Sequence, residues 1–157
     1  MKQLLLNFTA PPAPDFDNFV IGANAEAVTV ARAIAADGTG GVTYFWGAPG
    51  SGKSHLLRAM ARAAQSSVYR HGEPFSADRL LLIDDIDRQD ESILQPLFNR
   101  INAGGAAVVV TARSAPRDLT IRLDLATRLA SGLTFQLHAL SDAEKEAALT
   151  AHAAARG

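Results

Sequence analysis

The sequence contains no cysteine and no long apolar run, and it has only one tryptophan and two methionines. Without cysteine it can form neither a disulfide scaffold nor a thiolate metal site, and it has no cysteine nucleophile. Its best apolar run, residues 106–110, has the length of a strand and falls far short of the roughly 18 residues that suggest a membrane span. The N-terminus lacks the layout of a signal peptide. We therefore expect a cytoplasmic protein without a membrane partner.

An excess of positive charge is also missing. Lysine and arginine total 15 against 16 for aspartate and glutamate, which gives a formal net charge of −1. This balance argues against a protein whose whole surface binds nucleic acid, although a local basic edge remains possible. The hydrophobic fraction of 48% with 20% charged residues is typical of a globular chain, and 157 residues suffice for one domain.

The pattern along the chain predicts alternating helices and buried strands. Residues 1–14 read as a tail, because a Pro-rich stretch removes backbone donors and stiffens the chain there. Apolar spacing then predicts helices over 23–36, 55–64, 91–101 and 123–129, and a last helix that begins at the capping box Ser141-Asp142-Ala143-Glu144. Strands are expected over 42–46, 80–83, 106–111 and 133–138, with a further candidate at 67–69. This order predicts a three-layer α/β fold around a parallel sheet.

A phosphate-binding loop follows the first expected strand. The eight residues Gly47-Ala48-Pro49-Gly50-Ser51-Gly52-Lys53-Ser54 satisfy the G-x-x-x-x-G-K-[ST] pattern, and a helix is expected after them. Glycines let backbone N–H groups turn toward phosphate oxygens, and the helix adds the positive end of its dipole. Lys53 would reach the β- and γ-phosphates, and Ser54 would bind Mg²⁺. A chance Gly-rich turn is the alternative, which the combination of motif and context makes improbable.

A second set of acidic residues follows the strand expected at 80–83. Asp84 would hold Mg²⁺ through water, and Asp85 would lie where a carboxylate can orient an attacking water. The aspartate at 85 is one methylene shorter than the more usual glutamate, so we expect weak hydrolysis or none. Aspartates that cap a turn after a strand are the alternative explanation. Together with the loop, these residues predict that the chain binds a nucleoside triphosphate or diphosphate.

At this point the sequence resembles a known family, the AAA+ cores of the bacterial replication initiator DnaA and its homologue Hda. The resemblance is carried by six segments in the family order, and the later ones are closer to Hda: residues 16–24, 52–57, 81–86, 97–101, 116–119 and 124–129. Leu140-Ser141-Asp142 then matches the start of the small helical lid. The resemblance implies three parts: a tail at 1–14, a nucleotide-binding core at 15–139 with a five-stranded sheet, and the first helix of a truncated lid at 140–157.

The resemblance also assigns roles to single residues. It places Val20 and Ile21 beside adenine, with His55 following the phosphate loop, and it makes Thr111 a sensor of the γ-phosphate. It implies ADP or ATP with Mg²⁺ as the ligand. Two departures stand out. The family usually has an aspartate where Arg113 stands, and residues 54–83 form a shorter stretch than in either relative, which leaves no room for the DNA-binding helices of DnaA.

Two further segments imply partners. Arg128 matches the arginine finger of the family, a residue that acts on the nucleotide of a neighbouring subunit. The tail residues Gln3, Leu4, Leu6 and Phe8 resemble the peptide by which Hda docks on the DNA polymerase sliding clamp. A tail strand that packs on its own core is the alternative for this segment, and a solvated surface charge is the alternative for Arg128.

Three hypotheses follow. The favoured one is a regulator of replication initiation that docks on the clamp and promotes hydrolysis of ATP bound to the initiator DnaA. The second is a stand-alone AAA+ ATPase such as a helicase loader, and the third is an initiator-type DNA-binding domain, against which the near-neutral charge and the short 54–83 stretch argue. Homo-oligomer formation is left open. No strong direct nucleic-acid binding is expected.

Overall fold

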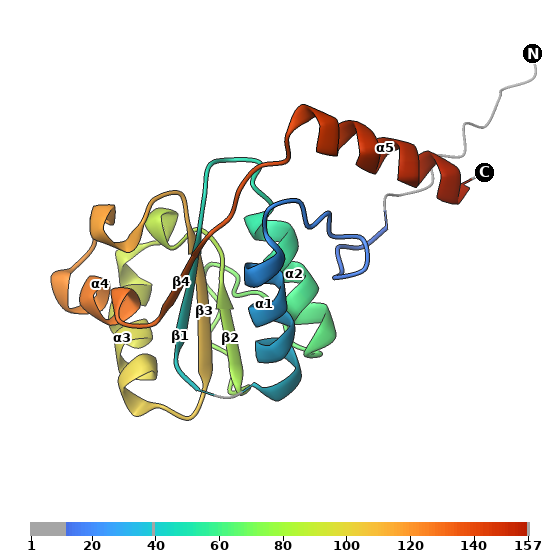
Figure 1. The fold of residues 1–157 in the computed structure, drawn as a ribbon. Coiled ribbons are helices and arrows are strands. Elements are labelled where there is room, and N and C mark those ends of the chain that lie inside the picture. The colour runs from blue at the N-terminus through green and yellow to red at the C-terminus, as the bar shows by residue number, and fades with distance from the viewer. Residues whose placement is uncertain (1–11, 39, 157) are drawn as a thin grey trace, which may run out of the picture.

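The computed structural model describes residues 12–38 and 40–156, and these residues form a three-layer α/β fold (Figure 1). The strands are β1 (Val42–Trp46), β2 (Leu80–Ile83), β3 (Ala107–Ala112) and β4 (Leu133–Gln136). They form one parallel sheet in the order β2-β3-β1-β4. The helices are α1 (Ala25–Asp37), α2 (Lys53–Ala63), α3 (Leu94–Ala103), α4 (Leu123–Ala130) and α5 (Asp142–Arg156). The predicted fold class is confirmed.

Each face of the sheet is covered by a pair of helices. In Figure 1, α1 and α2 lie on one side of the strands and α3 and α4 on the other. Successive residues of a strand point to opposite faces, so Phe45 packs with the first pair and Tyr44 with the second. Leu82 and Leu81 are divided between the two faces in the same way. Strands buried on both faces explain why β2 and β3 consist almost entirely of apolar residues.

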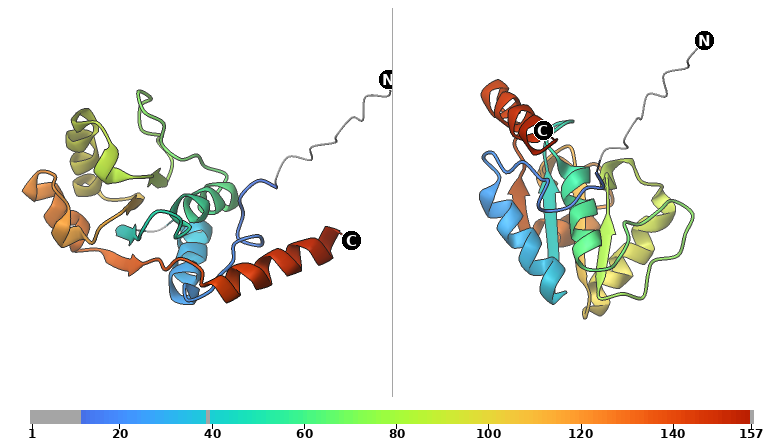
Figure 2. Two further views of the ribbon diagram at one scale, coloured as in Figure 1. Left: turned by 90° about the horizontal axis from the view of Figure 1, so that it is seen from above. Right: turned by 90° about the vertical axis from the view of Figure 1, so that its right-hand side faces the viewer.

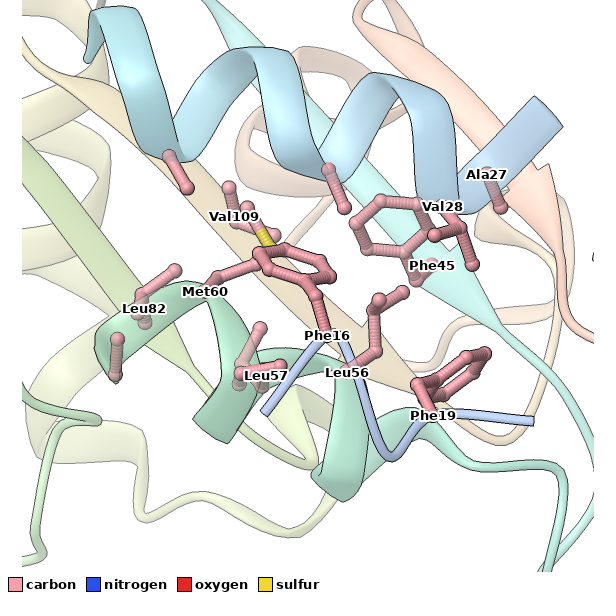
Figure 3. Close-up of a cluster of buried hydrophobic side chains, with 14 of the residues drawn as sticks. Phe16, Phe19, Ala27, Val28, Phe45, Leu56, Leu57, Met60, Leu82 and Val109 are labelled. Atoms are coloured by element: carbon pink, nitrogen blue, oxygen red, sulfur yellow. The ribbon is translucent and has the colours of Figure 1, made fainter. Parts of the chain in front are cut away.

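The core beneath α1 and α2 also contains part of the segment before α1. Phe16 and Phe19 are buried there, 8% and 7% exposed, beside Leu56 and Met60 of α2 (Figure 3). The guanidinium of Arg32 on α1 lies 4.9 Å from the centre of the Phe16 ring, within the range of a cation–π contact. The residues that precede α1 therefore belong to the packed core.

The sheet has four strands where the resemblance implied five. The candidate strand at 67–69 is reduced to one bridge, in which Val68 pairs with Leu82 and the Tyr69 amide donates to the Leu82 carbonyl at 2.8 Å. The residues that follow include Gly72 and Pro74 and lack the apolar alternation of a strand, so the pairing does not extend.

The start of α3 and the end of β4 differ from the prediction, and several other boundaries differ by one or two residues. Residues 91–93 form a short 3₁₀ turn, and α3 begins at Leu94, which places Pro96 in its first turn where a missing N–H costs little. Two other 3₁₀ turns cover Ile86–Arg88 and Pro116–Asp118. Strand β4 ends at Gln136, so His138 lies beyond it.

His138 is held instead by a residue far away in the sequence. The Asn24 side-chain amide donates to the His138 carbonyl at 2.9 Å, and the His138 N–H donates back to the Asn24 side-chain oxygen at 2.8 Å. Asn24 is 3% exposed, and it joins the start of α1 to the stretch that leads into α5.

The start of α5 has the predicted capping box. The Glu144 amide donates to Ser141 Oγ and the Ser141 amide donates to Glu144 Oε1, both at 3.1 Å. From there α5 runs away from the sheet (Figure 2). A Cβ on Gly22 would lie 2.4 Å from Glu144 Oε2, so the turn before α1 contacts the first turn of α5. Among the described residues, no helix is long and apolar enough to cross a membrane.

We expect the change Asn24→Ala to lower the free energy of unfolding by about 1–3 kcal/mol, because it removes both hydrogen bonds between the Asn24 side chain and the His138 backbone. Urea unfolding followed by circular dichroism measures the change. The matched control is Asn102→Ala, at an exposed position in the last turn of α3, which is expected to change stability by less than about 0.5 kcal/mol. An Asn24→Ala variant as stable as wild type would contradict a structural role for this pair of hydrogen bonds.

Candidate functional site

The loop between β1 and α2 surrounds a small hollow at the carboxyl end of the strands. Gly50 and Gly52 have φ angles of 83° and 97°, a region that residues with a Cβ rarely adopt. A Cβ on Gly52 would lie 3.2 Å from the Phe19 ring, and one on Gly47 would lie 2.5 Å from the Leu137 carbonyl oxygen. The glycines of the motif are therefore required by conformation and by close packing.

Lys53, the first residue of α2, is folded back into this loop. Its side chain is 7% exposed, and Nζ donates to the carbonyl oxygens of Gly47 at 2.7 Å and Ala48 at 3.0 Å. Burial lowers the pKa of Lys53, and the nearby carboxylates of Asp85 and Asp84 oppose that shift. A buried ammonium group that donates to neutral oxygens, the two carbonyls and Ser51 Oγ at 3.4 Å, is suited to receive an anion.

The next residue, Ser54, begins a network that crosses to the neighbouring strands. Ser54 Oγ donates to Asp84 Oδ2 at 2.6 Å, and Thr111 Oγ1 donates to Asp84 Oδ1 at 2.5 Å. The Asp85 amide donates to Thr111 Oγ1 at 2.8 Å. Helix α2 and the ends of β2 and β3 are thus joined through one carboxylate, and the structure brings together the predicted Ser54, Asp84 and Thr111.

The donor set here fits Mg²⁺. A serine hydroxyl and an aspartate carboxylate are hard oxygen ligands, and Mg²⁺ usually takes one or two such groups together with waters and substrate phosphates. Within the described ranges no group of three or more histidine, cysteine or acidic side chains could hold a metal. Ser54 and Asp84 would therefore hold a magnesium ion jointly with phosphate oxygens, as in other phosphate-binding loops.

Asp85 lies beside this network in an unusual conformation. Its φ of 48° is in the left-handed region, where aspartate is tolerated better than most residues. Burial raises the pKa of Asp85, and the charges of Asp84 and Asp87 raise it further, against a smaller opposing effect of Lys53. The site thus holds one carboxyl group whose ionised form is disfavoured.

His55 joins the loop to the segment before α1. Its Nε2 lies 2.9 Å from Asn18 Oδ1 and 3.1 Å from the Asp15 carbonyl oxygen. The Asp15 amide also donates to Asn18 Oδ1, which identifies that atom as an acceptor, so His55 carries its proton on Nε2. The His55 ring meets the Phe19 ring edge to face, with 5.2 Å between centroids. The position of α2 at its first turn therefore depends on residues 15–19.

The two residues assigned to the adenine side follow Phe19 directly. Val20 and Ile21 are each 41% exposed, although both are large and apolar. They lie between the buried Phe19 and the turn at Gly22 that contacts α5. An exposed apolar pair at this position is suited to the flat face of a base.

One residue that lines the hollow, Arg113, had no predicted role. The cavity has a volume of about 350 Å³, and eight residues line it: Pro49, Gly50, Gly52, Lys53, Ser54, His55, Asp85 and Arg113. Seven of these were predicted site residues. Arg113 was noted only as a departure from the family pattern, although its place two residues after Thr111 could have indicated its location.

Arg128 lies elsewhere, on the exposed face of α4. Leu125 and Leu129 of the same helix are fully buried, and Arg128 is exposed. It is not among the residues that line the cavity of its own chain. Arg122, at the start of α4, is held by Asp124, by the Gln95 side chain and by the Phe98 ring, whose centre lies 5.3 Å from the guanidinium. The tail residues Gln3, Leu4, Leu6 and Phe8 lie outside the described residues.

Comparison with known proteins agrees with the fold and the loop. The family model "Bacterial DnaA ATPAse domain" matches residues 12–72. Domain III of the Thermotoga maritima replication initiation protein DnaA superposes with a TM-score of 0.73 at 20% identity, covering 89% of this chain and 74% of that domain. A DNA replication initiation factor gives a TM-score of 0.74 at 18% identity over 93% of this chain and 55% of the other.

A third structure, the replication initiator DnaA bound to AMPPCP and single-stranded DNA, gives a TM-score of 0.67 at 19% identity, with 86% of this chain and 52% of that chain covered. The present chain thus spans about three quarters of DnaA domain III and about half of the two longer relatives. Its fold is that of a P-loop α/β core. The match to the DnaA ATPase model covers residues 12–72, the segment that contains the phosphate loop and the residues before α1.

We expect the change Asp85→Asn to raise the free energy of unfolding at pH 7. The pKa of Asp85 is raised in the folded state, so its ionisation above that pKa costs stability, and the cost disappears below the pKa of the unfolded chain, about 3.9. The gain should therefore shrink as the pH falls from 7 toward 4. Urea unfolding at a series of pH values measures it, with the exposed Asp17→Asn as control. A gain that is the same at all pH values would contradict this account.

Proposed function

We propose that this chain binds ADP or ATP with Mg²⁺ at the loop between β1 and α2. The observation that carries the proposal is the hydrogen-bonded set Ser54, Asp84 and Thr111 next to the buried Lys53. Backbone N–H groups of Gly50–Ser54 and the start of α2 would receive the phosphates, and Lys53 would exchange its carbonyl partners for phosphate oxygens. Ser54 and Asp84 would hold the metal ion.

The base would lie against Val20 and Ile21. These two apolar residues are exposed, and the segment that carries them is fixed to the loop through Phe19 and His55. The AMPPCP in one related DnaA structure supports an adenine nucleotide as the ligand. Gly22, which follows Ile21, lies next to Glu144 of α5.

We expect Lys53→Ala to reduce the affinity for ADP at least tenfold, because it removes the buried charge that meets the phosphates. Titration calorimetry with ADP and Mg²⁺ measures the affinity, and circular dichroism checks the fold. Lys145→Ala, which removes an exposed lysine on α5, should bind as wild type does. Unchanged ADP affinity in a folded Lys53→Ala variant would contradict the assignment of the site.

We further propose that the protein regulates replication initiation by acting on the ATP of a DnaA-type partner. The match of residues 12–72 to the DnaA ATPase model and the likeness in fold to DnaA domain III support this role. Arg128 is exposed on α4 and does not line the cavity of its own chain, so a role on nucleotide requires the nucleotide of another chain. In that role its guanidinium would stabilise charge on the γ-phosphate during hydrolysis.

The N-terminal tail would bring the protein to the sliding clamp. Gln3, Leu4, Leu6 and Phe8 combine one amide with three apolar anchors, which suits a peptide that fills a groove on the sliding clamp. The described core begins with Phe16 packed against α2, so a tail at residues 1–14 would reach a partner from a fixed point. Docking at the clamp would bring Arg128 to initiator molecules near newly replicated DNA.

We expect Arg128→Ala to retain ADP binding and clamp binding but to lose at least 100-fold of the stimulation of DnaA ATP hydrolysis, because a finger acts mainly on the transition state. The triple change Gln3→Ala, Leu4→Ala and Phe8→Ala should lose clamp binding in a pull-down and retain ADP binding. The assay is ATP hydrolysis by DnaA with clamp loaded on DNA.

The control for charge is Arg117→Ala, since Arg117 is highly exposed whereas Arg122 is held by Asp124 and Phe98. Normal stimulation by Arg128→Ala would contradict the finger, and unchanged clamp binding by the triple variant would contradict the tail as a docking peptide. The alternative of a stand-alone ATPase is favoured if the isolated chain hydrolyses ATP at about 1 s⁻¹, the low end of typical enzymes.

A further inference from the structure

Arg113 occupies a central place in the candidate site. It follows directly after β3, the strand between β1, which leads into the phosphate loop, and β2, which leads into Asp84. The Gly47 amide donates to the carbonyl of Ala112, the residue before Arg113, at 3.1 Å. Arg113 lines the same cavity as Lys53 and Asp85. Two positively charged residues therefore line one hollow.

The backbone around Arg113 is fixed on both sides. The Arg113 amide donates to Asp87 Oδ2 at 3.2 Å. Tyr44 Oη on β1 donates to the carbonyl oxygen of Ser114 at 2.7 Å. Tyr44 is fully buried, so this hydrogen bond is protected from water and anchors the turn after β3 to the core.

The Arg113 guanidinium, by contrast, is uncommitted. Although Asp85 and Asp87 are close in space, neither forms an ion pair with Arg113 in the described part of the chain, where the only ion pairs join Arg117 to Asp118 and Arg122 to Asp124. Lys53 and Arg113 both line this cavity. An anion bound between these two cations would relieve their mutual repulsion.

We propose that Arg113 binds the terminal phosphate of ATP and makes the site prefer ATP to ADP. This inference rests on the proposed nucleotide site. The γ-phosphate is the relevant group because Arg113 lines the cavity together with Asp85 and lies two residues after Thr111, whose hydroxyl contacts Asp84. In a phosphate-loop site the metal ligands and the water-orienting carboxylate face the bond between the β- and γ-phosphates. A guanidinium fits phosphate oxygens in a two-pronged geometry that an ammonium group cannot match.

The test compares two nucleotides rather than one. Titration calorimetry with Mg²⁺ measures the affinities of wild type, Arg113→Ala and Arg113→Lys for ADP and for AMPPCP, an analogue that retains a γ-phosphate and resists hydrolysis. Arg113→Ala should lose about tenfold in affinity for AMPPCP and less than about twofold for ADP. Arg113→Lys should recover part of the difference. Arg117→Ala, which removes the same charge four residues later on an exposed 3₁₀ turn, should bind both nucleotides as wild type does.

The outcomes separate this inference from the nucleotide site itself. If Arg113→Ala leaves the ratio of the AMPPCP and ADP affinities unchanged, the inference about Arg113 is wrong. The nucleotide site itself is still supported in that case if Lys53→Ala reduces the affinity for ADP. Equal losses for both nucleotides would mean that Arg113 contributes only general positive charge, and they also overturn the inference. If wild type binds neither nucleotide, the proposed nucleotide site is wrong and the role of Arg113 falls with it.

Discussion

The carboxylate of Asp84 is the interaction on which the site depends. One of its oxygens accepts from Ser54 on α2 and the other from Thr111 on β3, while Asp84 itself directly follows β2. Three elements that are separate in the sequence are thus held at one point by short hydrogen bonds to a charged group, which are the stronger kind. The parallel sheet makes this possible, because its strands all end at the same edge and present the residues that follow them together.

The rest of the site is arranged around that point. The loop brings Lys53, and the turn after β3 brings Arg113, to the lining of one cavity. Holding these charged groups in one partly buried place costs free energy. Burial lowers the pKa of Lys53 and raises the pKa of Asp85, so it disfavours the charged form of each. Such costs are typical of sites that are completed by a ligand.

Much of this arrangement was predictable from the sequence because local rules dominate it. The motif residues Gly47–Ser54 define the loop without knowledge of the fold, and fully apolar strands at 80–83 and 107–110 can only be buried on both faces. The capping box at Ser141 and Glu144 is a short-range pattern too. These features depend on residues a few positions apart.

The features that were missed depend on residues far apart in the sequence. Asn24 and His138 are 114 residues apart in the sequence, and no periodic pattern predicts that they pair. The expected fifth strand is limited to one bridge at Val68, because the residues that follow lack the apolar alternation of a strand. Arg122 became a structural residue only because α3 supplies Gln95 and Phe98 beside it. The location of Arg113 in the cavity likewise required the register of β3 against β1.

The Asn24–His138 pair has a consequence for how signals could cross the molecule. It joins the turn that carries Val20 and Ile21 to the base of α5, and the contact of Gly22 with Glu144 reinforces the joint. A partner protein that held α5 in one fixed orientation relative to the core would therefore alter the surface that Val20 and Ile21 offer to a base. By thermodynamic reciprocity, a nucleotide that favoured the same orientation would strengthen the binding of that protein by an equal factor. The change in partner affinity caused by nucleotide and the change in nucleotide affinity caused by the partner would then measure the same coupling free energy.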